Sequence, residues 1–364
     1  MKISEITNYL ESLAPLSHQE NYDNSGLIIG DPNAEVKSAL ISLDCTEEIV
    51  DEAIAKGYGL IISHHPIVFS GLKKLNGKTY VERTVIKAIK NDIALYAIHT
   101  NLDNYNLGVN HKIAELLQLK DVKVLSPKEN TLLKLAFYVP NKNKTEVLNA
   151  LFEAGAGNIG NYSECSFSSK GEGTFKPENG ADPFIGKVGE LSRDEEVKVE
   201  VILPTHHRNS VTNSLMNSHP YEEVAHEFTA LLNTNQDIGS GMIGELENGC
   251  DEVAFLQKIK DTFQCGIIRH TALQNKPIKR VAVCGGAGGF LLNLAKKNKA
   301  DIFITADYKY HEFFDAENQI VIADIGHFES EQYTTNLLGD ILTKKFPKFA
   351  VHLTGINTNP IKYF

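Results

Sequence analysis

Short apolar runs alternate with amphipathic helical stretches in two separate parts of this sequence, and that alternation limits the possible folds more than any other feature. In the first part, strand-like runs lie at Ala39–Leu43, Leu60–Ile62 and Ile93–Ile98, and helical patterns lie between them at Glu47–Lys56 and Val81–Lys90. This order is typical of βαβ units, in which strands pair in a mostly parallel sheet.

The same order returns after residue 278. Val281–Val283 leads into a glycine-rich turn, Phe290–Lys297 has a helical pattern, and Ile302–Ile304 and Ile320–Ile322 are further apolar runs. We therefore predict an α/β protein with two α/β halves, whose mostly parallel sheets face a shared cleft.

The segment between the two halves has a different pattern. Strands are predicted at Leu132–Val139, Val197–Leu203 and Val224–Leu232, and helices at Thr145–Ala154 and Asn209–Met216. A β-α-β … β-α-β order of this length indicates an inserted ferredoxin-like α+β domain. The predicted segments are 1–129 and 233–364 for the α/β domain and 130–232 for the insertion.

Charge and composition exclude several classes of protein. The net charge of −10 over 364 residues disfavours nucleic-acid binding, which needs a basic surface. No apolar run reaches the ~18 residues of a membrane span, and the acidic, amphipathic start of the chain is not a signal peptide. The five cysteines contain no CxxC pair, which indicates free thiols. We expect a cytoplasmic protein.

Aspartate and histidine side chains, which can take part in chemistry, follow the ends of the predicted strands. Asp44, His64, His99, Asp307 and His327 each come directly or shortly after an apolar run. Ligands of open α/β sheets bind beyond the carboxyl ends of the strands, so these side chains are placed to converge.

Two adjacent histidines, His64 and His65, follow the second strand and precede Pro66. Neighbouring side chains in extended backbone point to opposite sides, and proline favours extended backbone in the residue before it. Two metal ions, one for each imidazole, suit this geometry better than one. A solvated pair of loop histidines is the alternative.

The next strand ends at His99, and Asp103 lies in the following loop. A carboxylate can bridge two divalent ions, and mixtures of histidine and carboxylate suit Zn, Mn, Fe or Co. We favour Asp103 as a ligand over its alternative role as a helix N-cap. His99 is a candidate for proton transfer or for supporting a ligand.

His327 and Glu331 lie four residues apart at the start of a predicted helix that runs to Thr343. This spacing places both side chains on one helical face, close enough to share a metal site. His311 follows the strand Ile302–Ile304 and is a second candidate general acid or base, with a plain helix-start residue as the alternative.

At this point the chain resembles the GTP cyclohydrolase I type 2 homologues, also called the Nif-three-like dinuclear-metal proteins. The matching motifs are Tyr22–Leu27, Ser63–Pro66, His99–Asp103, Cys284–Gly286, Ala300-Asp301, Tyr310-His311, Gly326-His327 and Glu331. The insertion resembles the PII/CutA-like domain that some members carry, at Gly155–Gly157, Ile159–Tyr162, Cys165–Phe167 and His219–Glu223.

The resemblance implies two divalent ions in each subunit. It places one ion on His65, Asp103 and Glu331. It places the other on His64, His327 and the same glutamate, which would bridge the two. It also implies a toroidal homohexamer with the metal sites facing an inner cavity.

Two functions remain open at this level. The leading one is a metal-dependent hydrolase of a nucleotide or related small molecule, because a pair of metal ions can activate water and polarise the bond under attack. The alternative is a metal-loaded regulatory protein that binds a ligand without turnover. The family name alone does not establish the substrate.

Overall fold

The computed structural model describes residues 1–364 and divides into two compact units. The larger unit is discontinuous and contains residues 1–127 and 236–364; the smaller unit contains residues 128–235. No helix in either unit combines the length and the apolar character that a bilayer crossing requires.

The first sheet of the larger unit has five strands. Their order is β1 (Gly26–Ile29), β4 (Ala94–Ala97), β3 (Leu60–Ser63), β2 (Ser38–Ser42) and β15 (Ala350–Leu353). All neighbouring pairs are parallel except β1 with β4. This sheet is mostly parallel, as the alternation of strands and helices predicts.

The second sheet has six strands and is mixed. Their order is β11 (Arg269–His270), β14 (Val321–Asp324), β13 (Ile302–Ala306), β12 (Ile278–Ala287), β10 (Gly239–Cys250) and β5 (Lys120–Pro127). Only the pairs β12–β13 and β13–β14 are parallel; the other three pairings are antiparallel. The prediction of a mostly parallel second sheet is therefore wrong, because β5, β10 and β11 each join the sheet by antiparallel pairing.

Each sheet contains one strand from the part of the sequence that mainly builds the other sheet. β5 precedes the insertion yet pairs with β10 of the second sheet, and β15 follows the second sheet yet pairs with β2 of the first. Neither sheet is complete without a strand from the opposite side of the insertion.

Nine α-helices belong to the larger unit. They are α1 (Ile3–Leu13), α2 (Glu47–Lys56), α3 (Tyr80–Lys90), α4 (Thr100–Asp103), α5 (Val109–Leu116), α8 (Glu252–Phe263), α9 (Leu292–Lys297), α10 (His327–Glu331) and α11 (Thr334–Lys345). Short 3₁₀ helices lie at Leu16–His18, Gly289–Leu291 and Tyr310–Ala316. The single helix predicted from His327 to Thr343 is two helices, separated at Gln332 and Tyr333.

Local sequence explains where α2 begins and ends. The Thr46 side chain accepts a hydrogen bond from the backbone N–H of Ile49, which satisfies one free donor of the first turn. Gly57 ends the helix with a φ of 73°, a conformation that glycine adopts without a Cβ penalty. These signals explain why the predicted and observed bounds of α2 agree.

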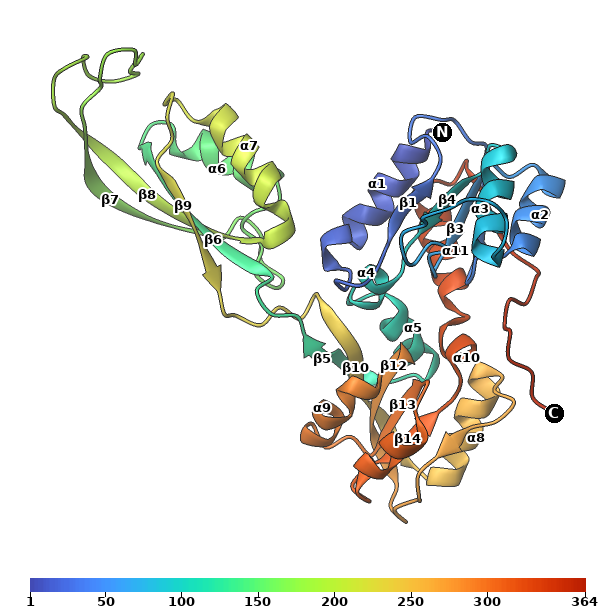
Figure 1. Ribbon diagram of the computed structural model, residues 1–364. Helices are drawn as coiled ribbons and strands as arrows, with labels where there is room; N and C mark the ends of the chain where they lie inside the picture. The colour runs from blue at the N-terminus through green and yellow to red at the C-terminus, as the bar shows by residue number, and fades with distance from the viewer. The chain divides into compact units, whose positions relative to one another are not determined.

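Side chains of the first sheet alternate between two apolar layers. On β3, Ile61 packs with buried residues of α2 and α3, whereas Leu60 and Ile62 pack with buried residues of α1 and α11. Figure 1 shows α1 on the opposite side of this sheet from α2 and α3. The buried layers leave the carboxyl ends of the parallel strands free to carry polar residues.

The smaller unit is a four-stranded antiparallel sheet with two helices. The strand order is β7 (Ser166–Phe175), β8 (Ser192–Pro204), β6 (Leu132–Pro140) and β9 (His226–Leu231). The helices are α6 (Lys144–Glu153) and α7 (Arg208–Ser218), with a 3₁₀ turn at Thr205–His207. Along the chain the elements run β-α-β-β-α-β, and α6 and α7 lie side by side on one face of the sheet (Figure 1).

Candidate metal centre

His64 and His65 extend β3 beyond its last residue. Their backbone N–H groups donate to the carbonyls of Ser42 and Leu43, so both residues continue the pairing with β2. Extended backbone turns the two side chains to different sides. His64 is fully buried, whereas His65 lies at the wall of a cavity.

A backbone carbonyl fixes the orientation of His64. Its Nδ1 lies 2.8 Å from the carbonyl oxygen of Ile98, so Nδ1–H donates to this oxygen. Burial lowers the pKa of His64 to about 3, which favours the neutral form of the ring. Nε2 of His64 then has a free electron pair. This atom lies 3.6 Å from Oδ1 of Asp103 and 3.9 Å from Oε2 of Glu331.

Carboxylates fix the orientations of His65 and His327. Nδ1 of His65 lies 2.8 Å from Oδ1 of Asp44, and Nδ1 of His327 lies 2.7 Å from Oδ2 of Asp307. Such carboxylate–imidazole contacts orient metal-binding histidines and make them better donors. The two Nε2 atoms then face each other across 3.3 Å.

Glu331 lies where these imidazoles meet. Its Oε2 is 3.0 Å from Nε2 of His65 and 3.1 Å from Nε2 of His327. Although burial opposes ionisation, the charge and hydrogen bond of His327 hold the pKa of Glu331 well below its usual range. Burial lowers the pKa values of the two histidines, but contacts with carboxylates reverse this effect and raise them, to about 9 for His65 and about 11 for His327.

Asp103, at the end of α4, is the second buried carboxylate. Burial, and then the negative charge of Glu331, raise the pKa of Asp103 well above its usual value. Its Oδ1 and Nε2 of His64 are both buried and have no hydrogen-bond partner. Buried polar atoms normally have partners, so these two atoms indicate a site for a bound cation.

The spacing and chemistry of the donors fit two divalent ions. Donors around one ion with bonds of about 2.0–2.2 Å lie about 3.0–3.5 Å apart, close to the contacts described above. A cation would also reduce the repulsion between the two buried carboxylates. It would separate the two imidazole Nε2 atoms that now face each other. Two groups whose donor atoms lie within 4.8 Å share Glu331: one adds His65 and His327, and the other adds His64 and Asp103.

This grouping differs from the one that the family resemblance implied. The structure groups His65 with His327, and His64 with Asp103. The resemblance instead implied His65 with Asp103, and His64 with His327. Glu331 is common to both groups, as the resemblance implied. The five predicted ligands, from β3, α4 and α10, are all brought together.

A glycine makes room for the shared carboxylate. Gly286, at the end of β12, has a φ of +61°, and a Cβ there would lie only 2.4 Å from Oε1 of Glu331. Its backbone N–H donates to Oγ of Ser330, which ties the turn to α10. The N–H of Gly286 is therefore used within the protein, and this residue packs closely against Glu331.

His99 lies beside the candidate metal centre and is held by Asp23. Its Nδ1 lies 2.7 Å from Oδ1 of Asp23, whose other oxygen accepts hydrogen bonds from the N–H and hydroxyl of Thr100. Despite burial, these hydrogen bonds lower the pKa of Asp23. The His99 ring centroid is 5.3 Å from those of both His64 and His65, and its donor atom forms a third possible ligand group with theirs.

His311 is not brought into this cluster. The residue is exposed on the 3₁₀ helix Tyr310–Ala316, and its ring contacts those of Tyr310 and Phe314. Asp307, four residues earlier, has a φ of +58° and makes the contact with His327 instead. The turn at Asp307 therefore leaves this aspartate, and not His311, at the centre.

A cavity of about 330 Å³ opens onto the exposed side of the cluster. Its polar wall consists of His65, His99, His327 and Asp44, and its apolar wall of Leu43, Pro66, Phe69, Phe328, Pro360 and Ile361, with Asn359 beside them. The segment after β15 is held in place because the hydroxyl of Thr358 donates to Oδ2 of Asp44 at 2.6 Å.

Sequence reasoning missed several of these supporting residues. Asp44 and Asp307 were noted only as strand-end residues, and their contacts with imidazoles could have been suspected from that position. Asp23 has no sequence signal beyond its place in the motif Tyr22–Leu27, and the segment around Thr358 has none. These residues act through contacts between segments that are distant in sequence.

Known proteins match this chain over nearly its whole length. The Duf34/NIF3 (NGG1p interacting factor 3) family matches residues 1–360. The GTP cyclohydrolase 1 type 2 homolog of Bacillus subtilis (strain 168) is 38% identical over 369 residues, covering 99% of this chain and 98% of that protein. The protein of that name from Halalkalibacterium halodurans is 38% identical over 371 residues, covering 100% of both.

Solved structures give the same result. A Bacillus cereus protein related to NIF3 superimposes with a TM-score of 0.87 at 36% identity, covering 100% of this chain and 99% of that one. The Staphylococcus aureus protein SA1388 superimposes with a TM-score of 0.79 at 31% identity, with the same coverage. The chain therefore belongs to the Duf34/NIF3 family.

Proposed function

We propose that the protein holds two divalent metal ions and uses them to hydrolyse a nucleotide or a related small molecule. The observation that carries this proposal is the position of Glu331, whose Oε2 lies 3.0–3.9 Å from an Nε2 atom of three histidines. Glu331 with His65 and His327 would hold one ion, and Glu331 with His64 and Asp103 the other. Zn, Mn, Fe and Co all suit these donors.

The bound ions would supply Lewis acidity and an acidified water at neutral pH. The chain's own contribution begins with His99, whose Nδ1 is occupied by Asp23 and whose other ring nitrogen is free to take or give a proton. The negative charge of Asp23 would stabilise the imidazolium that forms when His99 accepts a proton. Asp23 thus fixes both the tautomer and the direction of the ring.

The cavity would bind and orient the substrate. Phe69 and Phe328 offer ring faces on which a planar base can lie, and Asn359 offers a polar group at the same wall. The apolar residues Pro66 and Ile361 would exclude water around the bound molecule. We propose that this cavity belongs to the cleft shared by the two α/β halves.

Turnover and metal content test this proposal together. Purified protein should contain two ions per chain by elemental analysis, and an anomalous-scattering map should place them at the five ligands. A panel of nucleotides should include one that the metal-loaded protein hydrolyses. His64→Ala and Glu331→Ala should abolish that turnover, whereas His270→Ala, an exposed histidine outside the centre, should not. Activity that survives loss of both ligands would refute the assignment.

A second candidate function rests on the smaller unit. We propose that this unit, with the strand order β7-β8-β6-β9 and two helices on one face, is a ferredoxin-like insertion of the PII/CutA type. Proteins of that kind bind ligands or assemble oligomers, so a metal-loaded regulatory homohexamer is the alternative to an enzyme. Tight binding of metal and ligand without turnover of any nucleotide, in a particle of six chains by light scattering, would favour it.

A further inference from the structure

The smaller unit has a cavity of its own on the face of the sheet that α6 and α7 leave uncovered. Strand register separates the two faces: Phe137 pairs with Val199, and both are buried beneath the helices. Tyr138 lies one residue from Phe137 and Glu196 lies three residues from Val199, so both side chains point to the other face. There they line a cavity of about 410 Å³, within the usual range for small-molecule sites.

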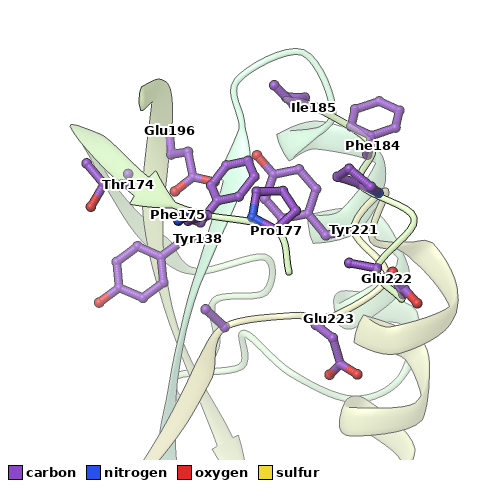
Figure 2. A pocket seen from close by; sticks show the side chains of 15 residues that line it. Tyr138, Thr174, Phe175, Pro177, Phe184, Ile185, Glu196, Tyr221, Glu222 and Glu223 are labelled. Atoms are coloured by element: carbon purple, nitrogen blue, oxygen red, sulfur yellow. The ribbon is translucent and has the colours of Figure 1, made fainter. Parts of the chain in front are cut away.

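Four aromatic side chains line the cavity. Tyr221 is central: its ring centroid lies 6.2 Å from that of Phe175 and 6.1 Å from that of Phe184. Tyr138 contributes a fourth ring, and Pro177 lies between the rings in Figure 2. Phe175 is the last residue of β7, and Pro177 and Phe184 belong to the loop after it, here called the covering loop, which forms part of the wall.

The motif His219–Glu223 builds this wall. Nε2 of His219 lies 2.9 Å from the carbonyl oxygen of Tyr138, and its Nδ1 accepts the N–H of Tyr221 at 3.1 Å. Both ring nitrogens are therefore used inside the protein, and burial lowers the pKa of His219. The histidine is a support for two lining tyrosines, and it is not free to bind a metal or ligand itself.

A carboxylate without a cationic partner lies among these rings. Figure 2 shows Glu196 and the hydroxyl of Tyr221 on the same side of the cavity, beside Phe175. The ion pairs on the neighbouring part of the sheet join Lys134 and Lys198 to Glu200, and Glu196 belongs to none of them.

The strand leaves room for this carboxylate. At Gly173 of β7, a Cβ would lie 2.1 Å from Oε2 of Glu196. A glycine at this position therefore allows Glu196 to lie against the sheet and face the cavity. Two further acids lie at the wall: Glu222 accepts the N–H of Asp182 and holds the covering loop, and Glu223 is exposed.

Aromatic faces next to a carboxylate favour positive charge. The negative face of an aromatic ring attracts ammonium groups, most strongly where water is excluded. One ring of this wall already does so within the protein, because Nζ of Lys142 lies 4.8 Å from the ring centroid of Phe184. Lys176 is the one basic residue of the lining, and it is exposed.

We propose that this cavity is a binding site for a small organic cation, in which an ammonium group is carried on an apolar or aromatic body. Glu196 pairs with the ammonium group, and the rings of Tyr221, Phe175 and Tyr138 enclose the body. The site is independent of the metal centre, since none of its residues belongs to the larger unit.

A pair of probes of similar shape and opposite charge tests the proposal. The full-length protein is titrated at pH 7 with 2-phenylethylammonium and with 3-phenylpropionate, and binding is followed by calorimetry and saturation-transfer NMR. At this pH the amine is protonated and does not ligate metal ions. We expect saturable binding of the cation, at least about tenfold tighter than that of the anion.

Three variants locate the site. Glu196→Gln keeps the shape and removes the charge, so it should weaken binding of the cation by about tenfold. Gly173→Ala should weaken it similarly by displacing the same carboxylate, and it serves as the second test if the first variant fails to fold. Glu195→Gln, an exposed neighbour on the strand that does not line the cavity, should bind within about twofold of the unmodified protein.

The outcomes separate clearly. Equal affinity for the two probes, or no saturable binding of the cation, would overturn the assignment of a cation site. Folded Glu196→Gln protein that keeps full affinity would show that the cation binds elsewhere.

Discussion

Replacing Gly286 by alanine should weaken metal binding through a single added methyl group. The φ of +61° at this position is costly for any residue with a Cβ, by about 1 kcal/mol. The new Cβ would lie 2.4 Å from Oε1 of Glu331, whereas ordinary contacts begin near 3.4 Å, so the carboxylate must retreat by about 1 Å. Metal–ligand bond lengths vary by only about 0.2 Å, so the displaced carboxylate of Glu331 would no longer reach either ion at bonding distance.

The expected size of the effect follows from this displacement. Loss of supporting contacts alone typically weakens metal binding about 10- to 100-fold, and displacement of a shared ligand should reach at least that range. Gly57→Ala is the matched control, because its φ of +73° carries the same backbone cost but no atom lies within 4 Å of the added Cβ. Urea denaturation in a chelator should show both variants destabilised by about 1 kcal/mol.

Metal affinity then separates the two variants. Titration of chelated protein with Zn²⁺ or Mn²⁺, followed by calorimetry and elemental analysis, should show two ions bound to the Gly57→Ala protein. The Gly286→Ala protein should bind them at least about tenfold more weakly. If Gly286→Ala binds two ions with the affinity of the unmodified protein, then Glu331 does not hold the ions through the carboxylate position seen here.

Three further outcomes follow from the contacts around the centre. Chelation should lower the melting temperature of the unmodified protein, because ions at a hundredfold excess over their dissociation constant stabilise by about 2.7 kcal/mol per site; calorimetry of Glu331→Gln should show a much smaller difference. Asp23→Asn should reduce kcat at least about a hundredfold while elemental analysis finds the metal content unchanged, since it disturbs the tautomer of His99 without touching a ligand; unchanged turnover would remove His99 from the mechanism. Asp324→Ala should lower the free energy of unfolding by about 2–3 kcal/mol in urea titrations, because the buried carboxylate of Asp324 pairs with Arg269 and accepts hydrogen bonds from two backbone N–H groups. A loss below about 0.5 kcal/mol, the usual range for surface changes, would contradict this role.

Much of the candidate site could be predicted because its residues sit at recognisable places in the sequence. His64, Asp103 and His327 each follow a strand of a βαβ pattern, and parallel strands direct their carboxyl ends to one edge. The bounds of α2 were also predictable, since Thr46 and Gly57 are strong local signals. Local chemistry and strand periodicity were sufficient for these features.

Other features depend on contacts that periodicity does not encode. The antiparallel pairings of β5 and β10, the break between α10 and α11, and the position of His311 all depend on how distant segments pack. The grouping of the ligands is of the same kind, because which imidazole faces Asp103 is decided by the hydrogen bond from His64 to Ile98. Metal identity, substrate and assembly stay predictions.

The exchange of strands between the two sheets has a consequence for the order of events during synthesis. The first sheet needs β15, which emerges from the ribosome only after the insertion and the entire second sheet have been made. The N-terminal half must therefore wait with an unpaired edge on β2, while the smaller unit between the halves can already close its own core. The candidate metal pocket is thus among the last parts of the molecule to form, and a nascent chain that stalls before residue 350 would leave the edge of β2 unpaired and exposed to neighbouring chains.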